Sequence, residues 1–348
     1  MDSAISALLQ QGTVIPAHPL ALNQDLSLNE YRQRLLTRYY MASGAGGVAV
    51  GVHTTQFEIR DPKVNLLGTV LKMAAEEIDR AQLSRPFIKV AGICGPTEQS
   101  IEEAKLAAQY GYHVGLISMG GLADYSETDL IARARAISAI IPVFGFYLQP
   151  AVGGRVLSYD FWRSLAELPN VQAIKVAAFN RYQTLDVVRA VCDSSRRDEI
   201  ALYTGNDDNI IADLLTPYRF IVNGRQVEKR FVGGLLGHWA VWTQKAVELL
   251  EEIKQCILAD YKEVETLLQN GTIVTDMNAV IFDANNAFKG CIPGIHEILR
   301  RQGLLEGRWC LNPHELLSPG QQEEIDRITD SYPLYTDDDF VRSFLKEN

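Results

Sequence analysis

Residues 142–150, PVFGFYLQP, and residues 171–177, VQAIKVA, lie on either side of the segment YDFWRSLAEL at 159–168. The two outer stretches are short, apolar and rich in β-branched and aromatic residues, which is typical of buried strands. The middle segment has its apolar residues at helical spacing. A strand, a helix and a strand in this order form a parallel βαβ unit. The sequence therefore predicts strands over 142–147 and 171–176, with a helix over 159–168 between them.

The same alternation extends in both directions along the chain. Further strands are predicted over 13–17, 47–52, 87–92, 114–117, 200–204 and 231–236. Further helices are predicted over 28–41, 67–81, 100–110, 127–140, 184–192 and 239–257. Eight strands, each followed by a helix, fit the spacing of an α/β fold of the (β/α)8 TIM barrel type. An open doubly wound sheet is the main alternative, but no GxGxxG turn follows the first strand.

The residues outside this alternation predict two additions to the barrel. Only helical periodicity remains after about residue 258, over 260–268, 278–289, 295–302 and 320–332. We therefore expect a barrel over 1–257 and a C-terminal helical extension packed on it over 258–348. Asn223-Gly224, within 217–230, is a tight-turn signal and predicts a small hairpin before the last barrel strand. Helix caps are expected at Ser27, Thr97 and Ser126.

The composition excludes several classes of protein. Lys and Arg number 33 against 43 Asp and Glu, and the net charge of −10 argues against nucleic acid or an anionic membrane as the main partner. No apolar run reaches the roughly 18 residues of a membrane span, and the first residues lack a signal-peptide pattern, so we expect a cytoplasmic protein. Five scattered cysteines without a CxxC spacing favour buried thiols over disulfides or zinc ligands.

Lys175 is the residue most at odds with its surroundings. It lies in an apolar strand near the C-terminal end, and active sites of such barrels lie at that end of the strands. Burial lowers the pKa of a lysine and leaves a free amine that can attack a carbonyl and form an imine. The alternative is a side chain that extends to the surface. Lys89 serves as a comparison, because it lies earlier in its strand and further from the catalytic end.

Several other strand ends carry groups that could take part in chemistry. Tyr147 could carry protons or be a packed aromatic residue. Thr54 and Thr55 could hold a carboxylate or form an ordinary turn. The remaining candidates are His53 and His238, each an acid or base or a structural residue, and Gly233-Gly234, which either leave room for a backbone or ligand or mark a strand bulge. The acidic turn 205–209 fits helix capping better than a metal site, because no His or Glu lies nearby in sequence.

These residues together resemble a known family. Thr54-Thr55, Tyr147 with Pro150 and Gly153-Gly154, and Ile174-Lys175 are similar to the motifs of the dihydrodipicolinate synthase and N-acetylneuraminate lyase family of class I aldolase barrels. The Tyr and the Lys are 28 positions apart, and the similarity extends over about 12–332, including 303–305 and 316–318. The resemblance implies that Lys175 attacks the ketone of a 2-oxo acid, that Tyr147 shuttles protons, and that Thr54 and Thr55 hold the carboxylate and orient Tyr147.

The chain also departs from the family pattern. Gln56-Phe57 replace the glycine and glutamate that usually follow the two threonines, so we expect a reshaped pocket floor. The segment 118–121, SMGG, lacks the family's second tyrosine. The arginine of the synthase falls on Val152, and Arg155 replaces it only if the loop bends back. Lysine biosynthesis is therefore not the expected role.

The sequence thus predicts a Schiff-base lyase or aldolase that acts on a pyruvate-type 2-oxo acid through an imine on Lys175. Its predicted catalytic residues are Lys175, Tyr147 and Thr55, and its predicted substrate-binding residues are Thr54, His53, Gly233, Gly234 and Arg155. No cofactor or metal is expected beyond the covalent imine. A sugar-acid dehydratase or decarboxylase with the same imine, and a non-catalytic 2-oxo-acid-binding barrel, are the alternatives. The expected partners are the small-molecule substrate and further copies of the chain, as a dimer or tetramer, with neither nucleic acid nor membrane.

Overall fold

The computed structural model describes residues 1–348, and the chain divides into two compact units. The first unit comprises Met1–Thr13 and Ile88–Leu235, and the second comprises Val14–Phe87 and Leu236–Asn348. Lys175 and Tyr147 belong to the first unit, whereas Thr54 and Thr55 belong to the second.

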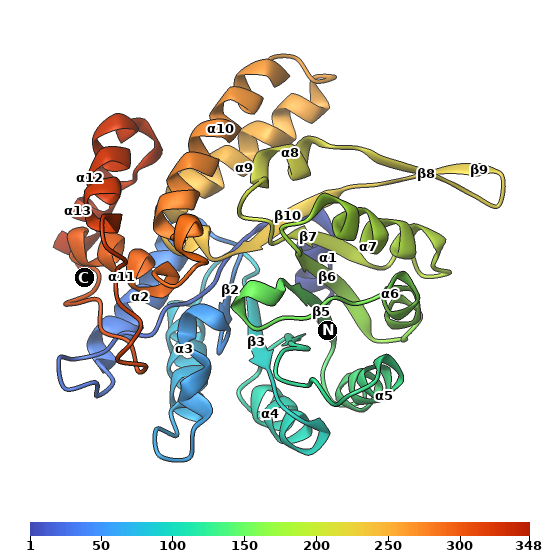
Figure 1. The fold of residues 1–348 in the computed structure, drawn as a ribbon, viewed down its shortest axis with the longest axis horizontal. Helices are drawn as coiled ribbons and strands as arrows, with labels where there is room; N and C mark the ends of the chain where they lie inside the picture. Colours follow the sequence, from blue (N-terminus) through green and yellow to red (C-terminus); the bar gives the residue numbers. More distant parts are fainter. The chain divides into compact units, whose positions relative to one another are not determined.

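The first unit is built on parallel strands in the order β10-β7-β6-β5-β4-β3. Their bounds are β3 (Ile88–Ile93), β4 (Val114–Ile117), β5 (Val143–Leu148), β6 (Val171–Ala177), β7 (Ala201–Thr204) and β10 (Phe231–Leu236). Nearly every residue of β3 to β7 is buried, because a parallel sheet is covered on both faces. Figure 1 shows α4, α5, α6 and α7 along the outer side of β3 to β7. The helices of this unit are α1 (Ser3–Gln11), α4 (Thr97–Gln109), α5 (Glu127–Ser138), α6 (Tyr159–Ala166), α7 (Arg181–Asp193) and α8 (Ile210–Leu215), and η3 (Pro150–Val152) is a short 3-10 turn.

The register between β5 and β6 decides which side chains share a face. Val143 pairs with Val171, but the next residue, Phe144, pairs with Ala173. One residue of β6 is therefore left over as a bulge, and every later pair is moved by one position. As a result Phe146 lies opposite Lys175, and Tyr147 lies opposite Val176.

The predicted hairpin is confirmed. It consists of β8 (Tyr218–Val222) and β9 (Arg225–Lys229), which pair in antiparallel fashion and lie beside α7 (Figure 1). Asn223 and Gly224 join the strands with φ of 49° and 75°, the left-handed conformations that a type I′ turn requires.

The second unit holds two parallel strands and the longest helices. Ala17, just after β1 (Val14–Pro16), forms a parallel bridge to Ala49 of β2 (Gly47–Val50). Hydrogen bonds from Gly46 N to Val14 O (3.1 Å) and from His18 N to Ala49 O (2.8 Å) extend this pairing. The helices are α2 (Glu30–Ala42), α3 (Leu67–Ala81), α9 (Thr243–Leu258), α10 (Val264–Ile281), α11 (Cys291–Arg301), α12 (Gln321–Ser331) and α13 (Asp338–Glu347). Short 3-10 turns are η1 (His53–Thr55), η2 (Phe57–Arg60), η4 (His238–Ala240), η5 (Ala284–Asn286) and η6 (Pro333–Tyr335).

The fold is a (β/α)8 TIM barrel with C-terminal helices, as predicted. Each of the eight predicted parallel strands is present within about two residues of its expected bounds. The predicted boundary at residue 257 falls inside α9 and stays a prediction. None of the five cysteines forms a disulfide, and four of them are buried. No helix of the structure combines the length and the apolar character that a bilayer crossing requires.

Some local predictions are wrong. Of the helix expected over 278–289, only 278–281 are helical, because α10 ends at Ile281 and Asp283, Ala287 and Phe288 then adopt positive φ. The helix expected over 260–268 begins only at Val264. The helices α1, α8 and α13 were not predicted. Of the expected caps, Ser126 forms a capping box with Asp129, whereas Asn29 caps α2 in place of Ser27 and Thr97 is already inside α4.

Replacing Ser126 by alanine is expected to lower the free energy of unfolding by about 1 kcal/mol, because the Asp129 N–H loses its side-chain acceptor. The matched control is Thr97→Ala, since Thr97 follows the N-cap residue Pro96 and its hydroxyl caps nothing. This control is expected to cost less than about 0.5 kcal/mol. Urea denaturation of both variants measures the difference, and equal losses would contradict the capping assignment.

Candidate active site

Lys175 lies in the interior of the first unit with its side chain only 7% exposed. The amine nitrogen lies 4.3 Å from the centre of the Phe146 ring. Burial lowers the pKa of the Lys175 amine from 10.5 to about 8, and the charge of Asp207 opposes this shift. A fraction of the side chain is therefore uncharged at neutral pH, as a nucleophilic amine must be.

Gly205, directly after β7, makes room for the lysine. A Cβ atom at this position would lie 2.5 Å from Lys175 Cε and 2.9 Å from Ala177 Cβ, which is closer than real Cβ atoms approach. Glycine at 205 thus lets the turn after β7 pack directly on the lysine side chain.

Lys89 is buried as well, but it lies at the other end of the strands. Its amine nitrogen is 3.4 Å from the position that a Cβ on Gly111 would take, and Gly111 precedes β4. The two strand lysines are therefore distinguished by position, as the sequence indicated, since active sites of such barrels lie at the C-terminal strand ends.

Tyr147 is not beside the lysine amine. Its ring stacks on Trp162 of α6, with ring centroids 5.2 Å apart and an interplanar angle of 22°. Its hydroxyl accepts a long hydrogen bond of 3.5 Å from Leu157 N. Burial raises the pKa of the Tyr147 hydroxyl. Because alternate residues of a strand face opposite sides, the register places Tyr147 on the face of the sheet opposite to Lys175 and Phe146.

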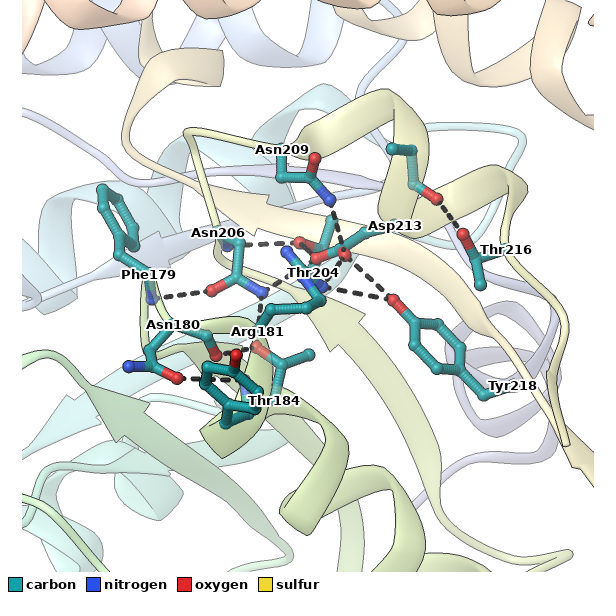
Figure 2. Close-up of polar contacts among 12 residues, drawn as sticks. Phe179, Asn180, Arg181, Thr184, Thr204, Asn206, Asn209, Asp213, Thr216 and Tyr218 are labelled. Carbon is teal, nitrogen blue, oxygen red and sulfur yellow. Dashed lines mark hydrogen bonds and ion pairs between the residues drawn. The ribbon is translucent and has the colours of Figure 1, made fainter. Parts of the chain in front are cut away.

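A buried carboxylate holds the turn after β7 (Figure 2). Asp213 of α8 is fully buried and pairs with the Arg181 guanidinium. It accepts hydrogen bonds from Thr204 Oγ1 (2.8 Å), Asn206 Nδ2 (2.8 Å), Asn209 Nδ2 (3.1 Å) and Tyr218 OH (3.0 Å). This use of the turn differs from the expected capping, since the Asn209 side chain makes no cap hydrogen bond.

Asn206 joins the turn after β7 to the loop after β6. Its Oδ1 accepts from Phe179 N at 3.0 Å, and its Nδ2 donates to Thr184 Oγ1 at 3.2 Å as well as to Asp213. Phe179 adopts a positive φ of 48°, so a strained residue follows the lysine strand and is fixed by this contact. Asn206 was not predicted to be a functional residue, although the turn 205–209 that contains it is unusually acidic.

The two predicted threonines form a buried turn in the second unit. Thr55 Oγ1 donates to His18 O at 2.7 Å and accepts from Gly51 N at 3.0 Å. Thr54 Oγ1 also donates to His18 O, at 3.3 Å. Both hydroxyl protons are therefore used within the protein, which favours the structural explanation for the pair.

His18 is a residue of this turn that sequence reasoning missed. Its ring is completely buried, with Nδ1 2.8 Å from Pro19 O and Nε2 2.9 Å from Thr37 Oγ1. Burial lowers the pKa of His18 to about 4, so the ring is neutral at physiological pH. Its position between Ala17 and Pro19, at the end of the first strand, was the available signal.

Gln56 occupies the position after the threonines in a left-handed conformation, with φ of 66°. The side chain is buried, and its Oε1 accepts a hydrogen bond of 2.6 Å from Leu311 N. His53 directly precedes the two threonines, with its ring 5.9 Å from that of Phe57. His238 is buried against Trp242, and burial lowers its pKa to about 4.

The other predicted binding residues contact the backbone. Space beside Gly233 is filled by the Thr13 backbone and the Tyr203 ring, and Gly234 N donates to Thr13 O at 3.2 Å. Arg155 Nη1 donates to Leu122 O (2.8 Å) and Tyr125 O (3.0 Å). These contacts are structural, and a role of the three residues in substrate binding stays a prediction.

Comparison with known proteins supports the family resemblance. No protein-family model matches the chain. The 4-hydroxy-tetrahydrodipicolinate synthases of two Bifidobacterium longum strains are each 26% identical to it over 200 residues, which is 56% of this chain and 60% of theirs. The chain thus spans less than two thirds of the length of these curated relatives.

Solved structures share the fold over nearly the whole chain. Dihydrodipicolinate synthase from Oceanobacillus iheyensis has a TM-score of 0.74 at 18% identity, covering 95% of this chain and 99% of its own. N-acetylneuraminate lyase from Fusobacterium nucleatum has a TM-score of 0.70 at 17% identity, covering 92% and 99%. The synthase from Acinetobacter baumannii, solved with pyruvate, has a TM-score of 0.72 at 17% identity, covering 92% and 98%. The chain is therefore similar in sequence to 4-hydroxy-tetrahydrodipicolinate synthases over 200 residues, and similar in fold to dihydrodipicolinate synthases and N-acetylneuraminate lyases.

Asn206→Asp is expected to lower the free energy of unfolding by about 2–4 kcal/mol at neutral pH, because it places a second carboxylate against the buried Asp213 and removes both donated hydrogen bonds. One of the two carboxylates then has a raised pKa in the folded state, so the loss relative to the unchanged protein shrinks as the pH falls toward 5.

The matched control is Asn209→Asp, because Asn209 is only half-buried and makes one of the same contacts. Urea denaturation at pH 5 and pH 8 measures both variants. A loss for Asn206→Asp that is small, or that does not change with pH, would argue against the network.

Proposed function

Because the chain is similar in sequence and fold to the dihydrodipicolinate synthase and N-acetylneuraminate lyase family, we propose that it is a lyase of the class I aldolase type that acts on a pyruvate-type 2-oxo acid. The observation that supports this proposal most is the buried Lys175 amine with a pKa of about 8. A relative by fold was solved with pyruvate.

In the proposed reaction the Lys175 nitrogen attacks the ketone carbon of the 2-oxo acid. The carbinolamine that forms loses water, and the product is an iminium ion on the lysine. The iminium accepts the electron pair of the carbon–carbon bond that breaks while the hydroxyl on the departing carbon loses its proton to a base, which gives an enamine and releases an aldehyde. Protonation of the enamine and hydrolysis of the imine then release the shorter 2-oxo acid and the free amine. The lysine itself is the electron sink, so the proposed reaction needs no further cofactor.

Lowering the lysine pKa has a large effect on the first step. At pH 7 an amine with a pKa of about 8 is uncharged roughly 300 times more often than one with the ordinary pKa of 10.5. Asp207 limits this effect, because its charge favours the protonated form.

The roles of the other predicted residues need adjustment in this proposal. Tyr147 lies on the opposite face of the sheet against Trp162, so it is a proton carrier to the amine only if the end of β5 turns over. Thr55 is tied to His18 O and Gly51 N, so we assign it the shape of its turn rather than a direct proton transfer. A dehydratase or decarboxylase remains the second candidate, because the enamine that forms when the same iminium loses a proton can expel a β-hydroxyl.

Incubation with pyruvate and borohydride is expected to modify Lys175, because borohydride reduces an iminium to a stable secondary amine. The rate is expected to rise with pH and to level off above about pH 8, where the amine is mostly uncharged, whereas an ordinary lysine continues to gain up to about pH 10.5. Mass spectrometry of proteolytic peptides locates the adduct.

Lys89→Ala is the matched control, since it removes the other buried strand lysine and leaves the adduct in place. Lys175→Ala is expected to abolish the adduct. An adduct at another residue, or none at all, would overturn the assignment of Lys175.

Screening hydroxylated 2-oxo acids then separates the two enzymatic candidates. Release of an aldehyde together with pyruvate is expected from a lyase. Loss of water or carbon dioxide without an aldehyde would identify the dehydratase or decarboxylase and contradict the lyase.

A further inference from the structure

The lysine amine rests on an aromatic face. The Lys175 nitrogen is 4.3 Å from the centre of the Phe146 ring, well within the roughly 6 Å over which a cation is attracted to such a ring. Phe146 is itself buried, on β5 directly opposite Lys175. The bulge between β5 and β6 puts this ring, rather than the Tyr147 phenol, next to the amine.

The face of a phenyl ring is electrically negative and has no proton to give. Such a group cannot act as an acid or base, but it favours a positive charge on the nitrogen above it. The attraction is stronger at a buried site, because water does not screen it. Lys175 is such a site.

We propose that Phe146 is a catalytic residue whose ring stabilises the cationic iminium on the Lys175 nitrogen. This inference rests on the proposed function. The positive charge appears when the neutral amine becomes the iminium, so the ring favours the intermediate over the reactants. Above the pKa of the amine the starting group is neutral, so the ring stabilises only the iminium. Below this pKa the ring also stabilises the starting ammonium ion, and the advantage of the iminium largely cancels.

Other groups around the amine are already accounted for. Asp207, after β7, is the charged group that acts on Lys175. Tyr203, opposite Lys175 on β7, donates its hydroxyl to Leu9 O at 2.9 Å. The Tyr147 hydroxyl is at Leu157 N. Replacing the Phe146 ring therefore changes one contact of the amine and leaves these in place.

The test keeps the shape of the ring and weakens its negative face. Phe146 is replaced by mono-, di- and trifluorophenylalanine, and the amount of pyruvate adduct trapped on Lys175 is measured at pH 7 and pH 9. We expect a stepwise decrease that reaches about 5- to 30-fold at pH 9 and is much smaller at pH 7. Phe146→Leu is expected to reduce the trapped adduct by a similar factor at pH 9. Phe146→Tyr, which keeps an aromatic ring, is expected to retain most of the adduct.

The matched control is the same fluorinated series at Phe144. This residue lies two positions earlier on the same face of β5, and its ring contacts Tyr203 with centroids 5.2 Å apart. The series at Phe144 is expected to leave the adduct unchanged. An equal decrease at both positions, or none at Phe146, would overturn the inference.

A second measurement does not depend on turnover. Competitive acetylation across a pH range gives the pKa of the Lys175 amine, which we expect to fall by about one unit with trifluorophenylalanine at position 146. If the unchanged protein forms no pyruvate adduct, the proposed function fails and the catalytic role of Phe146 fails with it, even where this pKa falls. If the adduct forms and neither quantity responds to fluorination, only the inference about Phe146 fails.

Discussion

The structure around the candidate site depends on placing one amine inside a parallel sheet that is buried on both faces. Desolvation penalises the charged form of Lys175 and thereby favours the neutral amine that the proposed reaction needs. The cost is limited by the Phe146 ring and by the charge of Asp207, which both favour the ammonium ion. The balance leaves the Lys175 amine with a pKa of about 8, so its neutral and charged forms are both populated near neutral pH.

A second buried charge lies nearby in the same unit but plays a different part. Asp213 is neutralised by Arg181 and surrounded by hydrogen-bond donors from β7, the turn after it and β8. A carboxylate with so many donors is held in one arrangement, and it fixes Asn206 and with it the turn that carries Gly205 and Asp207. The lysine site is thus shaped by a network that does not itself contact the amine.

The sequence was sufficient to predict the strands and the burial of Lys175, for one common reason. Parallel strands buried on both faces appear as continuous apolar runs, and a lysine interrupts such a run visibly. The sequence could not predict which face of the sheet the Tyr147 side chain occupies. Its distance of 28 positions from Lys175 matches the pairing of Val143 with Val171, but the bulge that follows moves the register by one residue. A shift of one residue turns a side chain to the opposite face, and apolar patterning cannot reveal it where both faces are buried.

The net charge of −10 describes the surface of the protein and does not by itself favour binding of an anion at the candidate site. The overall field repels an anionic 2-oxo acid, so binding must come from groups close to it. In the proposed reaction the iminium nitrogen is one such group, because it lies two bonds from the carboxylate carbon in surroundings with little water. Attraction between the iminium cation and the substrate carboxylate is strong in such surroundings. An aromatic face stabilises the iminium further and leaves its positive charge available to the carboxylate. A second carboxylate in direct contact with the nitrogen would compete with the substrate, whereas the Phe146 ring does not.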